Sequence, residues 1–476
     1  MNTKKKQFKD PVHGYISVRE DWCRDFIDTP IFQRLRYIEQ TSMRPLYPAA
    51  RHDRFIHSLG TFHLGQRVYN SILKNTTDGK LREKLNQKQL KNTFLIACLM
   101  HDCGHAPFSH TLEEFFNYAD SETTGRAYKL LREEFSNEDF AENFQPSPHE
   151  AFSAVLLNRF FADKMKKYNC DPELAARMIT GCTHPDESES DFALENRLIA
   201  LLNGDAIDVD KLDYILRDTW ASGVHNTAVD IDRLIASFLF HRDNNGKVEQ
   251  CFHKSALSVL QNVVDARNYL YEWVYNHHTV LYYSKLLNNS IRKLAKILSK
   301  DNDKDHFWKT VFSLESFEKQ TQINDKLKIY LPTDGDIIFL LKDFLDDIPE
   351  VLEILSHAPE RVALWKTYAE FKMLFKEKAV SNPVTGRGIS RRLPNLLSKK
   401  INCKESDIII ISALAKHYVI EDSHVYILID NEVKPFTELV SKRTAKASEF
   451  FFYVFVSPEY ADKKSEIIDL IRSQTR

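Results

Sequence analysis

The sequence predicts a mainly α-helical protein with a smaller α+β lobe toward its C-terminal end. Glycine is scarce, at 13 of 476 residues, and apolar residues recur at helical spacing through the first 300 positions. From about residue 330 the pattern changes to short runs rich in β-branched and aromatic residues, such as 449–456. We therefore divide the chain into an all-α core, residues 1–330, and an α+β lobe, residues 331–476.

Several helices can be placed from these patterns. Pro30 is well placed to start one, because proline is favoured at the first helical position, and apolar residues follow it at helical spacing. The run TFLIACLM, residues 93–100, predicts a buried helix. Residues 149–168 and 191–219 show the same spacing, and 255–299 predicts one very long helix.

Loops and strands complete the expected fold. Two polar or acidic stretches, 120–147 and 183–191, resemble loops or a mobile lid. A stretch rich in proline, glycine and arginine, 381–395, predicts a loop that either contacts an anion or another subunit or is simply solvated. Three runs predict strands and one predicts a closing helix: 407–420, 424–430 and 449–456, then 463–473.

Composition and charge exclude several classes of protein. The net charge is −2, so no broad basic field favours nucleic acid or an anionic membrane as a partner. No apolar run reaches the roughly 18–20 residues of a membrane span, and the N-terminus lacks the apolar segment of a secretory signal. The seven cysteines include no CxxC pair, which favours a reduced protein. We expect a cytoplasmic protein.

The adjacent pair His101 and Asp102 is the most informative local feature. Neighbouring residues on a regular helix project roughly 100° apart, so the two side chains cannot share one buried stripe. They make sense together around a common cation, since imidazole suits transition metals and carboxylate suits harder ions. A lone His-Asp dipeptide means little, but RFIHSLG upstream supplies His57 and GDAIDVDKLDYILRD downstream supplies Asp210.

A family resemblance rests on six motifs in fixed order. FKDPVHGYISV, IDTPIFQRLRYIEQ, RFIHSLG, MHDCGHAPFSHTLEE, PHE and IDVDKLDYILRD span about residues 6–280. Together they resemble the HD-domain dNTP triphosphohydrolases, which include the sterile-alpha-motif enzymes of animals and bacterial dGTPase-like homologues. The resemblance implies an HD-domain helical core. It also implies that His57, His101, Asp102 and Asp210 bind a divalent metal ion (Fe, Mn, Mg, Zn or Ni), with an additional Mg for the triphosphate.

The resemblance also implies a reaction. A water acidified by the metal would attack the α-phosphorus of a dNTP, releasing the deoxynucleoside and intact tripolyphosphate. His110 matches the general acid that protonates the leaving 5′ oxygen, and Glu113, three residues later, would orient it. His105 and His149 match further active-site histidines near the phosphates.

Substrate-binding residues follow by the same matching. Arg267 and Tyr275 lie two turns apart on one predicted helix face, as do Asp210, Tyr214 and Asp218 on another. The positions implied for phosphate and deoxyribose contacts are Gln40, Arg54, Lys211, Tyr214, Asp218, Arg267 and Tyr275. The chain departs from the family at Thr41, Met43 and Tyr271, which puts base preference and sugar selectivity in doubt but not the metal site.

An N-terminal group matches the family's regulatory nucleotide site. Lys6, Asp28, Gln33 and Arg36 correspond to residues that hold an activating nucleotide, dGTP or GTP, between subunits of a homodimer or tetramer. A carboxylate and a guanidinium can read a guanine edge. Lys9 stands where the animal enzyme has asparagine, so half of that site is expected to differ. The alternative is that these residues only pack an interface.

Two other functions stay open. An HD nucleotidase or phosphodiesterase would remove phosphate from mono- or oligonucleotides, but would leave Arg54, Lys211 and Arg267 without a triphosphate to bind. A non-catalytic nucleotide-sensing or single-strand-binding module would have no use for the His110–Glu113 pair.

Overall fold

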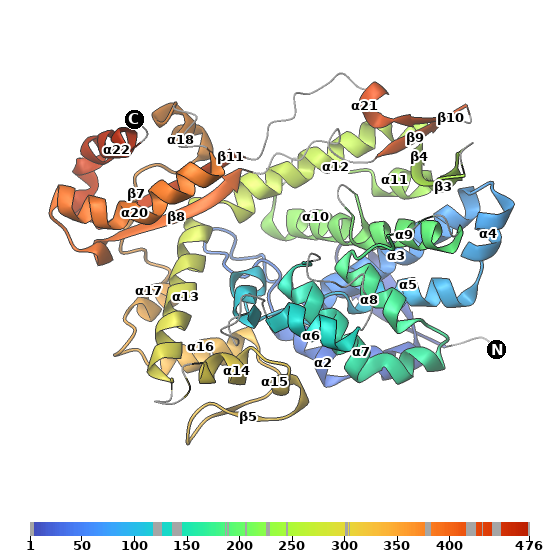
Figure 1. Ribbon diagram of the computed structural model, residues 1–476, viewed down its shortest axis with the longest axis horizontal. Helices are drawn as coiled ribbons and strands as arrows, with labels where there is room; N and C mark the ends of the chain where they lie inside the picture. Colours follow the sequence, from blue (N-terminus) through green and yellow to red (C-terminus); the bar gives the residue numbers. More distant parts are fainter. Residues whose placement is uncertain are drawn as a thin grey trace.

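The computed structural model describes residues 4–117, 126–135, 145–185, 187, 190–204, 207–224, 229–243, 246–299, 303, 305–376, 382–415, 425–430, 432–439 and 449–474. The fold is mainly α-helical, as predicted, and the described strands form four small sheets. The N-terminal and C-terminal ends of the chain lie at opposite ends of the molecule (Figure 1).

The chain begins with an antiparallel hairpin. Strands β1 (Lys5–Asp10) and β2 (Gly14–Arg19) pair in register, with Asp10 opposite Gly14. Gly14 has φ +77, in the left-handed region, so this tight turn suits glycine. Two short helices follow, α1 (Glu20–Trp22) and α2 (Pro30–Gln33).

The helix predicted after Pro30 is much shorter than the apolar spacing suggested. After α2 the chain forms a single 3₁₀ turn, Arg34–Tyr37, and becomes extended at Ile38. The reason is a backbone pairing: Ile38 accepts a hydrogen bond from Arg54, and Glu39 bridges to Asp53.

The central helices pack around α5. A side-chain N-cap from aspartate precedes five of these helices, at Asp53, Asp78, Asp171, Asp208 and Asp230. The helices are α3 (Arg54–Asn75), α4 (Gly79–Leu85), α5 (Lys88–Met100), α6 (Arg126–Glu134), α7 (Pro148–Lys167), α8 (Pro172–Thr180), α9 (Ser190–Leu202), α10 (Val209–Ser222) and α11 (Ile231–Ser237).

Helix α5 confirms the prediction of a buried helix at 93–100. Every residue from Asn92 to Met100 is buried, and the helix packs against α3, α7, α8 and α9. This surrounding core fixes the C-terminal end of α5, where the His-Asp pair follows.

Two long helix predictions were wrong in their continuity. The stretch 191–219 is two helices, because Asp208 caps α10 and also accepts the amide of Gly204, which turns the chain between them. The stretch 255–299 is α12 (Leu257–Leu270), a π-helical turn Tyr271–Tyr275, and α13 (His278–Ile297). His277 caps α13 through the amide of Thr279.

The first 330 residues are not purely helical. Besides β1 and β2, strands β3 (Phe238–Arg242) and β4 (Val248–His253) form a hairpin. Strands β9 (Tyr426–Ile429) and β10 (Glu432–Pro435) extend its sheet in the order β10-β9-β4-β3, with β4 and β9 parallel. Periodicity did not separate these short strands from helix. The domain division at residue 330 stays a prediction.

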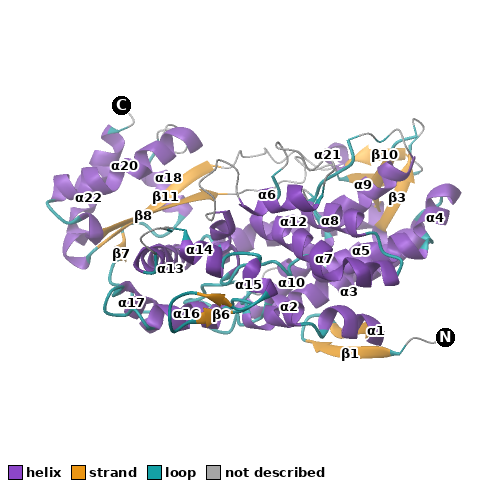
Figure 2. Cartoon of the chain, turned by 60° about the horizontal axis from the view of Figure 1, so that its bottom comes forward, coloured by secondary structure: helices purple, strands orange, loops and turns teal. Residues whose placement is uncertain are grey.

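The C-terminal part mixes helices with a three-stranded sheet of order β7-β11-β8. Figure 2 shows these strands with helices α18, α20 and α22 beside them, away from the N-terminal hairpin. The strands predicted at 407–420, 424–430 and 449–456 are confirmed over 408–415, 426–429 and 449–456, and the closing helix predicted at 463–473 is confirmed over 464–473. Residues 416–420 and 424 of the predicted strands lie outside the described residues. The elements are α14 (His306–Val311), α15 (Glu315–Glu318), β5 (Thr321–Gln322), β6 (Lys328–Ile329), α16 (Asp334–Lys342), α17 (Glu350–Ser356), β7 (Val362–Ala363), α18 (Tyr368–Leu374), α20 (Pro383–Ile401), β8 (Ile408–Ala415), α21 (Phe436–Leu439), β11 (Glu449–Val456) and α22 (Lys464–Ser473).

The loop predicted at 381–395 is instead the first part of α20. Asn382 caps this helix, and Ile389, Leu393 and Leu397 form a buried stripe along it. Burial of that stripe outweighs the weak helix propensity of its glycines and proline. Of the polar stretch 120–147, helix α6 lies within the described residues, which corrects part of the loop prediction; most of the remainder lies outside them. Part of 183–191 also lies outside.

Candidate functional site

The four predicted metal ligands come from the ends of three helices. His57 lies one turn into α3, His101 and Asp102 directly follow α5, and Asp210 is the second residue of α10. Because α3 packs against both α5 and α10, these helix ends meet. The packing of apolar helix faces therefore brings together side chains more than 100 residues apart.

The ligand atoms lie close to one another. His57 Nε2 is 2.9 Å from Asp210 Oδ1 and 3.6 Å from Asp102 Oδ2. His101 Nε2 is 3.5 Å from Asp102 Oδ1 and 3.5 Å from Asp210 Oδ1. Three of the side chains are buried, while that of Asp210 is 33% exposed and gives the site its accessible side.

The two histidines present the same nitrogen to this centre. His57 Nδ1 lies 2.7 Å from Asp213 Oδ2, and His101 Nδ1 lies 3.0 Å from the carbonyl oxygen of Cys98. If each Nδ1 carries the proton and donates it, each Nε2 has a lone pair for a metal. Both Nε2 atoms are buried without a well-formed hydrogen bond. This donor set, with its supporting carboxylate and carbonyl, fits a divalent transition metal.

The electrostatics of the site favour a cation. Burial alone would keep His57 neutral, but the carboxylates of Asp210 and Asp213 outweigh it and raise the pKa of His57 to about 10. Burial likewise opposes ionisation of Asp102, yet His101 and Arg54 hold the pKa of that carboxyl well below its usual range. The carboxylates therefore stabilise positive charge between the four side chains. A divalent ion would supply that charge in place of a proton.

Asp213 is the centre of a buried network behind His57. Besides His57 it accepts from His13 Nε2 at 2.6 Å and from Arg217, whose Nε and Nη2 lie at 2.8 and 3.0 Å. Arg217 Nη1 also donates to Asp10 at 2.8 Å. The N-terminal hairpin is thus joined directly to the residues that support a metal ligand, a role that sequence reasoning missed for His13 and Asp10.

Gly60 leaves the room that this network occupies. A Cβ atom at residue 60 would lie 1.9 Å from Asp213 Oδ1 and 2.4 Å from Arg217 Nη2. Only glycine permits α3 to pass this close to the charged pair.

A second histidine cluster lies beside the metal ligands. The rings of His105 and His149 stack at 4.0 Å, and the ring of His110 stands edge-on to both at 4.9 and 5.1 Å. His105 Nε2 is 3.5 Å from Asp102 Oδ1, so the two groups adjoin.

Glu113 serves two histidines of this cluster rather than one. Its Oε2 lies 2.7 Å from His149 Nδ1 and 3.2 Å from His110 Nδ1. Burial opposes charge on His149, but Glu113 outweighs it and raises the pKa of His149 to about 9. His105 is different: burial and the nearby charge of Arg54 hold its pKa well below the ordinary value. His110 is the exposed member, with 61% of its side chain accessible.

Two of the predicted phosphate contacts are engaged with protein groups in this structure. Arg54 donates from Nη1 to Asp102 at 2.8 Å and from Nε to Ser109 Oγ at 2.9 Å. Lys211 donates to the carbonyl of Gly204 at 2.7 Å and to Asp208 at 2.5 Å. Arg54 thus lies at the metal ligands, whereas Lys211 is bound to groups that precede α10.

The predicted sugar contacts gather around Asp218. Tyr275 donates to Asp218 Oδ2, and Asp218 Oδ1 lies 2.6 Å from His52 Nε2. Burial raises the pKa values of Tyr214 and Tyr275 well above 10, so both phenols stay neutral donors. His52 was missed from the sequence, where it is one polar residue in a loop with no periodic signal.

Two further residues predicted to bind substrate are Gln40 and Arg267. The backbone amide of Gln40 donates to the carbonyl of His52 at 3.0 Å. The side-chain oxygen Oε1 of Gln40 is buried and has no hydrogen-bond partner among the described residues. Arg267 is buried and lies over the ring of Tyr271 at 5.9 Å, and Tyr271 packs edge-on against Tyr275 at 5.2 Å.

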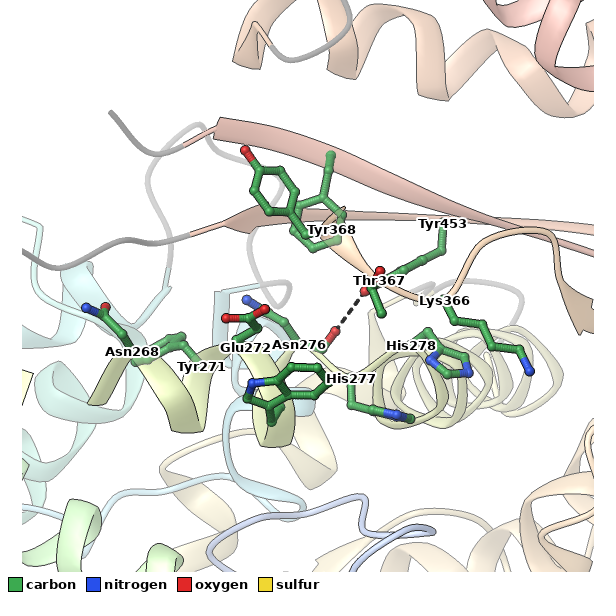
Figure 3. Close-up of a pocket in the computed structure, with 12 residues that line it drawn as sticks. Asn268, Tyr271, Glu272, Asn276, His277, His278, Lys366, Thr367, Tyr368 and Tyr453 are labelled. Atoms are coloured by element: carbon green, nitrogen blue, oxygen red, sulfur yellow. Dashed lines mark hydrogen bonds between the residues drawn. The ribbon is translucent and has the colours of Figure 1, made fainter. Parts of the chain in front are cut away.

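A separate cavity of about 250 Å³ is lined in part by Tyr271. Figure 3 shows His277 on one side of this cavity and Tyr453 of β11 on the other. Trp273 also lines it. Tyr453 Oη donates to the carbonyl of Asn276 across it at 3.2 Å. None of the predicted metal ligands lines this cavity, so it is distinct from the metal site.

The predicted regulatory residues lie close together. Lys6 on β1 pairs with Asp28 at 3.2 Å, and both side chains are nearly half exposed. Gln33 donates to the carbonyl of Ile27 at 2.9 Å and accepts from Arg36 Nε at 2.9 Å. Lys6 and Asp28 line a cavity of about 520 Å³. Lys9, the substituted position, lies over the ring of Tyr15 at 4.2 Å.

No helix within the described ranges combines the length and hydropathy that crossing a bilayer requires.

The chain matches a family model and several known proteins. A family model described as the HD domain matches residues 54–215, which include all four predicted metal ligands. An uncharacterized protein of Mycoplasma genitalium is 29% identical over 312 residues, covering 64% of this chain and 64% of that protein.

Several relatives carry an enzymatic name. The deoxynucleoside triphosphate triphosphohydrolase SAMHD1 homolog of Dictyostelium discoideum is 30% identical over 57% of this chain and 46% of its own length. The SAMHD1 protein of Gallus gallus is 27% identical over 77% of this chain and 56% of its own length. The chain spans less than two thirds of each of these curated relatives.

Solved structures show the same fold at low identity. A hypothetical protein from Aquifex aeolicus matches 98% of this chain and all of its own with a TM-score of 0.63 at 21% identity. A phosphohydrolase from Bacteroides thetaiotaomicron matches 95% of this chain and all of its own with a TM-score of 0.64 at 19% identity. The predicted resemblance to HD-domain dNTP triphosphohydrolases is confirmed by the family-model match and the curated relatives.

Proposed function

We propose that this chain, which carries an HD domain, is a metal-dependent dNTP triphosphohydrolase. The observation that supports this most strongly is the juxtaposition of two groups: the cluster of His57, His101, Asp102 and Asp210 with its unsatisfied Nε2 atoms, and the histidine cluster beside it. The first group fits a divalent ion, and the second offers an exposed imidazole for proton transfer.

The residues divide the chemistry among them. A divalent ion held by the four ligands would supply Lewis-acid stabilisation of phosphate oxygens and an acidified water. Arg54, next to Asp102, would neutralise phosphate charge in a buried setting where a guanidinium acts strongly. Attack at the α-phosphorus breaks its bond to the 5′ oxygen, and His110 would donate a proton to that oxygen.

Sugar selection is assigned to the group around Asp218. Tyr275 and His52 hold that carboxylate in a fixed orientation, in which it would accept a hydrogen bond from the 3′ hydroxyl. The ring of Tyr275 would lie against the C2′ face of the deoxyribose and leave no space or partner for a 2′ hydroxyl. This would favour dNTPs over NTPs.

Product analysis tests this proposal. The full chain is incubated with dGTP and Mn²⁺, and the phosphate products are separated. Tripolyphosphate and deoxyguanosine are expected. Release of orthophosphate would instead indicate a nucleotidase, and no product with any divalent ion tested would indicate a nucleotide-binding module. Asp102→Ala should remove the activity, whereas Asp232→Ala, which removes an exposed carboxylate paired with Arg67, should not.

We further propose regulation by a second nucleotide at Lys6, Asp28, Gln33 and Arg36. A triphosphate bridging two subunits there would stabilise a homodimer or tetramer, because a ligand stabilises whichever state binds it better. dGTP or GTP should then raise both solution mass and turnover of another dNTP for the parent, but not for Asp28→Ala. Equal mass and turnover in both proteins under all conditions would leave these residues as packing only.

A further inference from the structure

Residue Asp334 connects the C-terminal half of the chain to the loop that carries His110. It is the first residue of α16, whose N-terminus is already capped by Thr333 and Asp336. The Asp334 carboxylate is therefore not needed by its own helix. It accepts instead the amide of Phe108 at 2.6 Å and the amide of Glu39 at 2.9 Å, from segments more than 220 residues away.

The bond to Phe108 falls at an unusual point of the backbone. Phe108 and Ser109 have φ values of 57° and 50°, so two consecutive side-chain-bearing residues adopt the left-handed conformation. Such a conformation is unfavourable for L residues and persists only where the surroundings enforce it. The residue after this kink is His110.

Ser109 closes a ring of hydrogen bonds around Glu39. Its hydroxyl donates to the carbonyl of Glu39 at 2.7 Å, while Asp334 accepts from the amide of the same residue. Ser109 also accepts from Arg54, which binds Asp102. The kink, the segment leading to Gln40, and a metal ligand are thus held to one another through a few short bonds.

A buried arginine reinforces the same junction. Arg34 donates from Nε to the carbonyl of Pro332 at 2.7 Å and from Nη2 to the carbonyl of His105 at 2.8 Å. Two independent polar contacts therefore bind the segment 332–334 to the loop 105–108. Arg34 contacts the loop at His105, and Asp334 contacts it at Phe108.

We propose that Asp334 is a positioning residue, which fixes the left-handed kink at Phe108 and thereby sets where His110 and Gln40 stand relative to the metal ligands. This rests on the proposed hydrolase function for its kinetic consequence only; the structural consequence is independent of the reaction. Through Asp334, the segment beyond residue 330 would then help to position residues of the site.

Asp336 supplies a matched control. It lies two residues further along the same helix and its carboxylate accepts the amide of Thr333 at 2.8 Å, so Asp336→Asn damages the helix cap without touching the loop. Asp334→Asn keeps the size of the side chain, but its amide group cannot accept the second backbone hydrogen. Both variants are made in the full chain.

Hydrogen exchange and kinetics are then compared. In Asp334→Asn the amides of Phe108 and Glu39 should exchange about tenfold to a hundredfold faster. Its kcat should fall by a similar factor, with KM within about threefold and metal content unchanged. Asp336→Asn should show neither effect. If Asp334→Asn does not fold, Asp334→Glu, which keeps the charge but displaces both oxygens, is judged by the same criteria.

The outcomes separate this proposal from the proposed function. Unchanged exchange and unchanged kcat in Asp334→Asn would overturn the positioning role, as would the same two effects in Asp336→Asn. If the parent hydrolyses no dNTP, the exchange measurement alone decides: faster exchange at Phe108 and Glu39 supports the role, and parental exchange overturns it.

Discussion

Replacing Glu113 with glutamine should remove most of the pH dependence of stability that arises from His149. Burial disfavours charge on His149, but the Glu113 carboxylate, 2.7 Å away, raises its pKa from an ordinary 6.5 to about 9. Since the folded pKa is the higher one, this contribution to the free energy of unfolding is complete below about pH 6.5 and is lost as the pH rises through 9. The full difference corresponds to about 3 kcal/mol.

Urea unfolding between pH 6 and 9.5, with a chelator present, measures this effect. Both proteins should lose stability across the range, because the raised pKa of His57 contributes to each. Glu113→Gln should start lower than the parent and decline less steeply, since it lacks the contribution of His149. Glu114→Gln is the control, because Glu114 is 46% exposed and pairs with Arg292 at the surface, where such a pair contributes less than about 1 kcal/mol. Parallel curves for the parent and Glu113→Gln would refute the assignment of charge to His149.

Three further substitutions test the site. His110→Ala should lower kcat by roughly 10²–10⁴ with dNTP affinity nearly intact; unchanged turnover with lost binding would make His110 a substrate contact instead of an acid. Tyr275→Ala should narrow the preference for dATP over ATP, measured as the ratio of kcat/KM values, and a parent that turns over both equally would contradict this role. Asp213→Asn should weaken metal binding by about tenfold to a hundredfold in a metal titration. Its control is Asp232→Asn, because the Asp232 carboxylate is 80% exposed. Equal metal affinity in the two variants would show that Asp213 does not support His57.

The arrangement of the metal ligands was predictable because each one follows a strong local pattern. The apolar run before His101 requires a buried helix, and the residues around His57 and Asp210 carry helical starts with aspartate caps. When three such helices pack through their apolar faces, the polar residues at their ends lie close to one another. The roles of these residues in binding a metal stay predictions.

The supporting residues were not predictable by the same means. His13 reaches Asp213 across 200 residues of sequence, and His52 reaches Asp218 across 166. His13 lies in a turn and His52 in a loop, both without periodic pattern. Their contacts come from long-range packing that local spacing does not encode. The contacts of Asp334 were not predictable either, because an aspartate at the start of a helix is ordinarily favoured there by the helix dipole alone.

Fold predictions failed where local signals were overridden. The apolar period continues through 271–275, so nothing in it marks the π-helical turn or the break before α13. Conversely, the glycines and prolines of 383–395 suggested a loop, although a buried stripe on that segment stabilises a helix. In both places tertiary packing decided the backbone.

The space left at Gly60 links two positions that are 153 residues apart in sequence. With α3 and α10 in their present positions, a side chain at residue 60 would overlap the carboxylate of residue 213, because its first carbon would lie 1.9 Å from an oxygen of that group. Relatives that carry alanine or serine at the equivalent of residue 60 should therefore have lost the acidic residue at the equivalent of 213, or shifted the first turns of α3 outward. Comparing these two columns across related chains would distinguish sequences that keep a supported histidine from those in which the metal pocket has decayed.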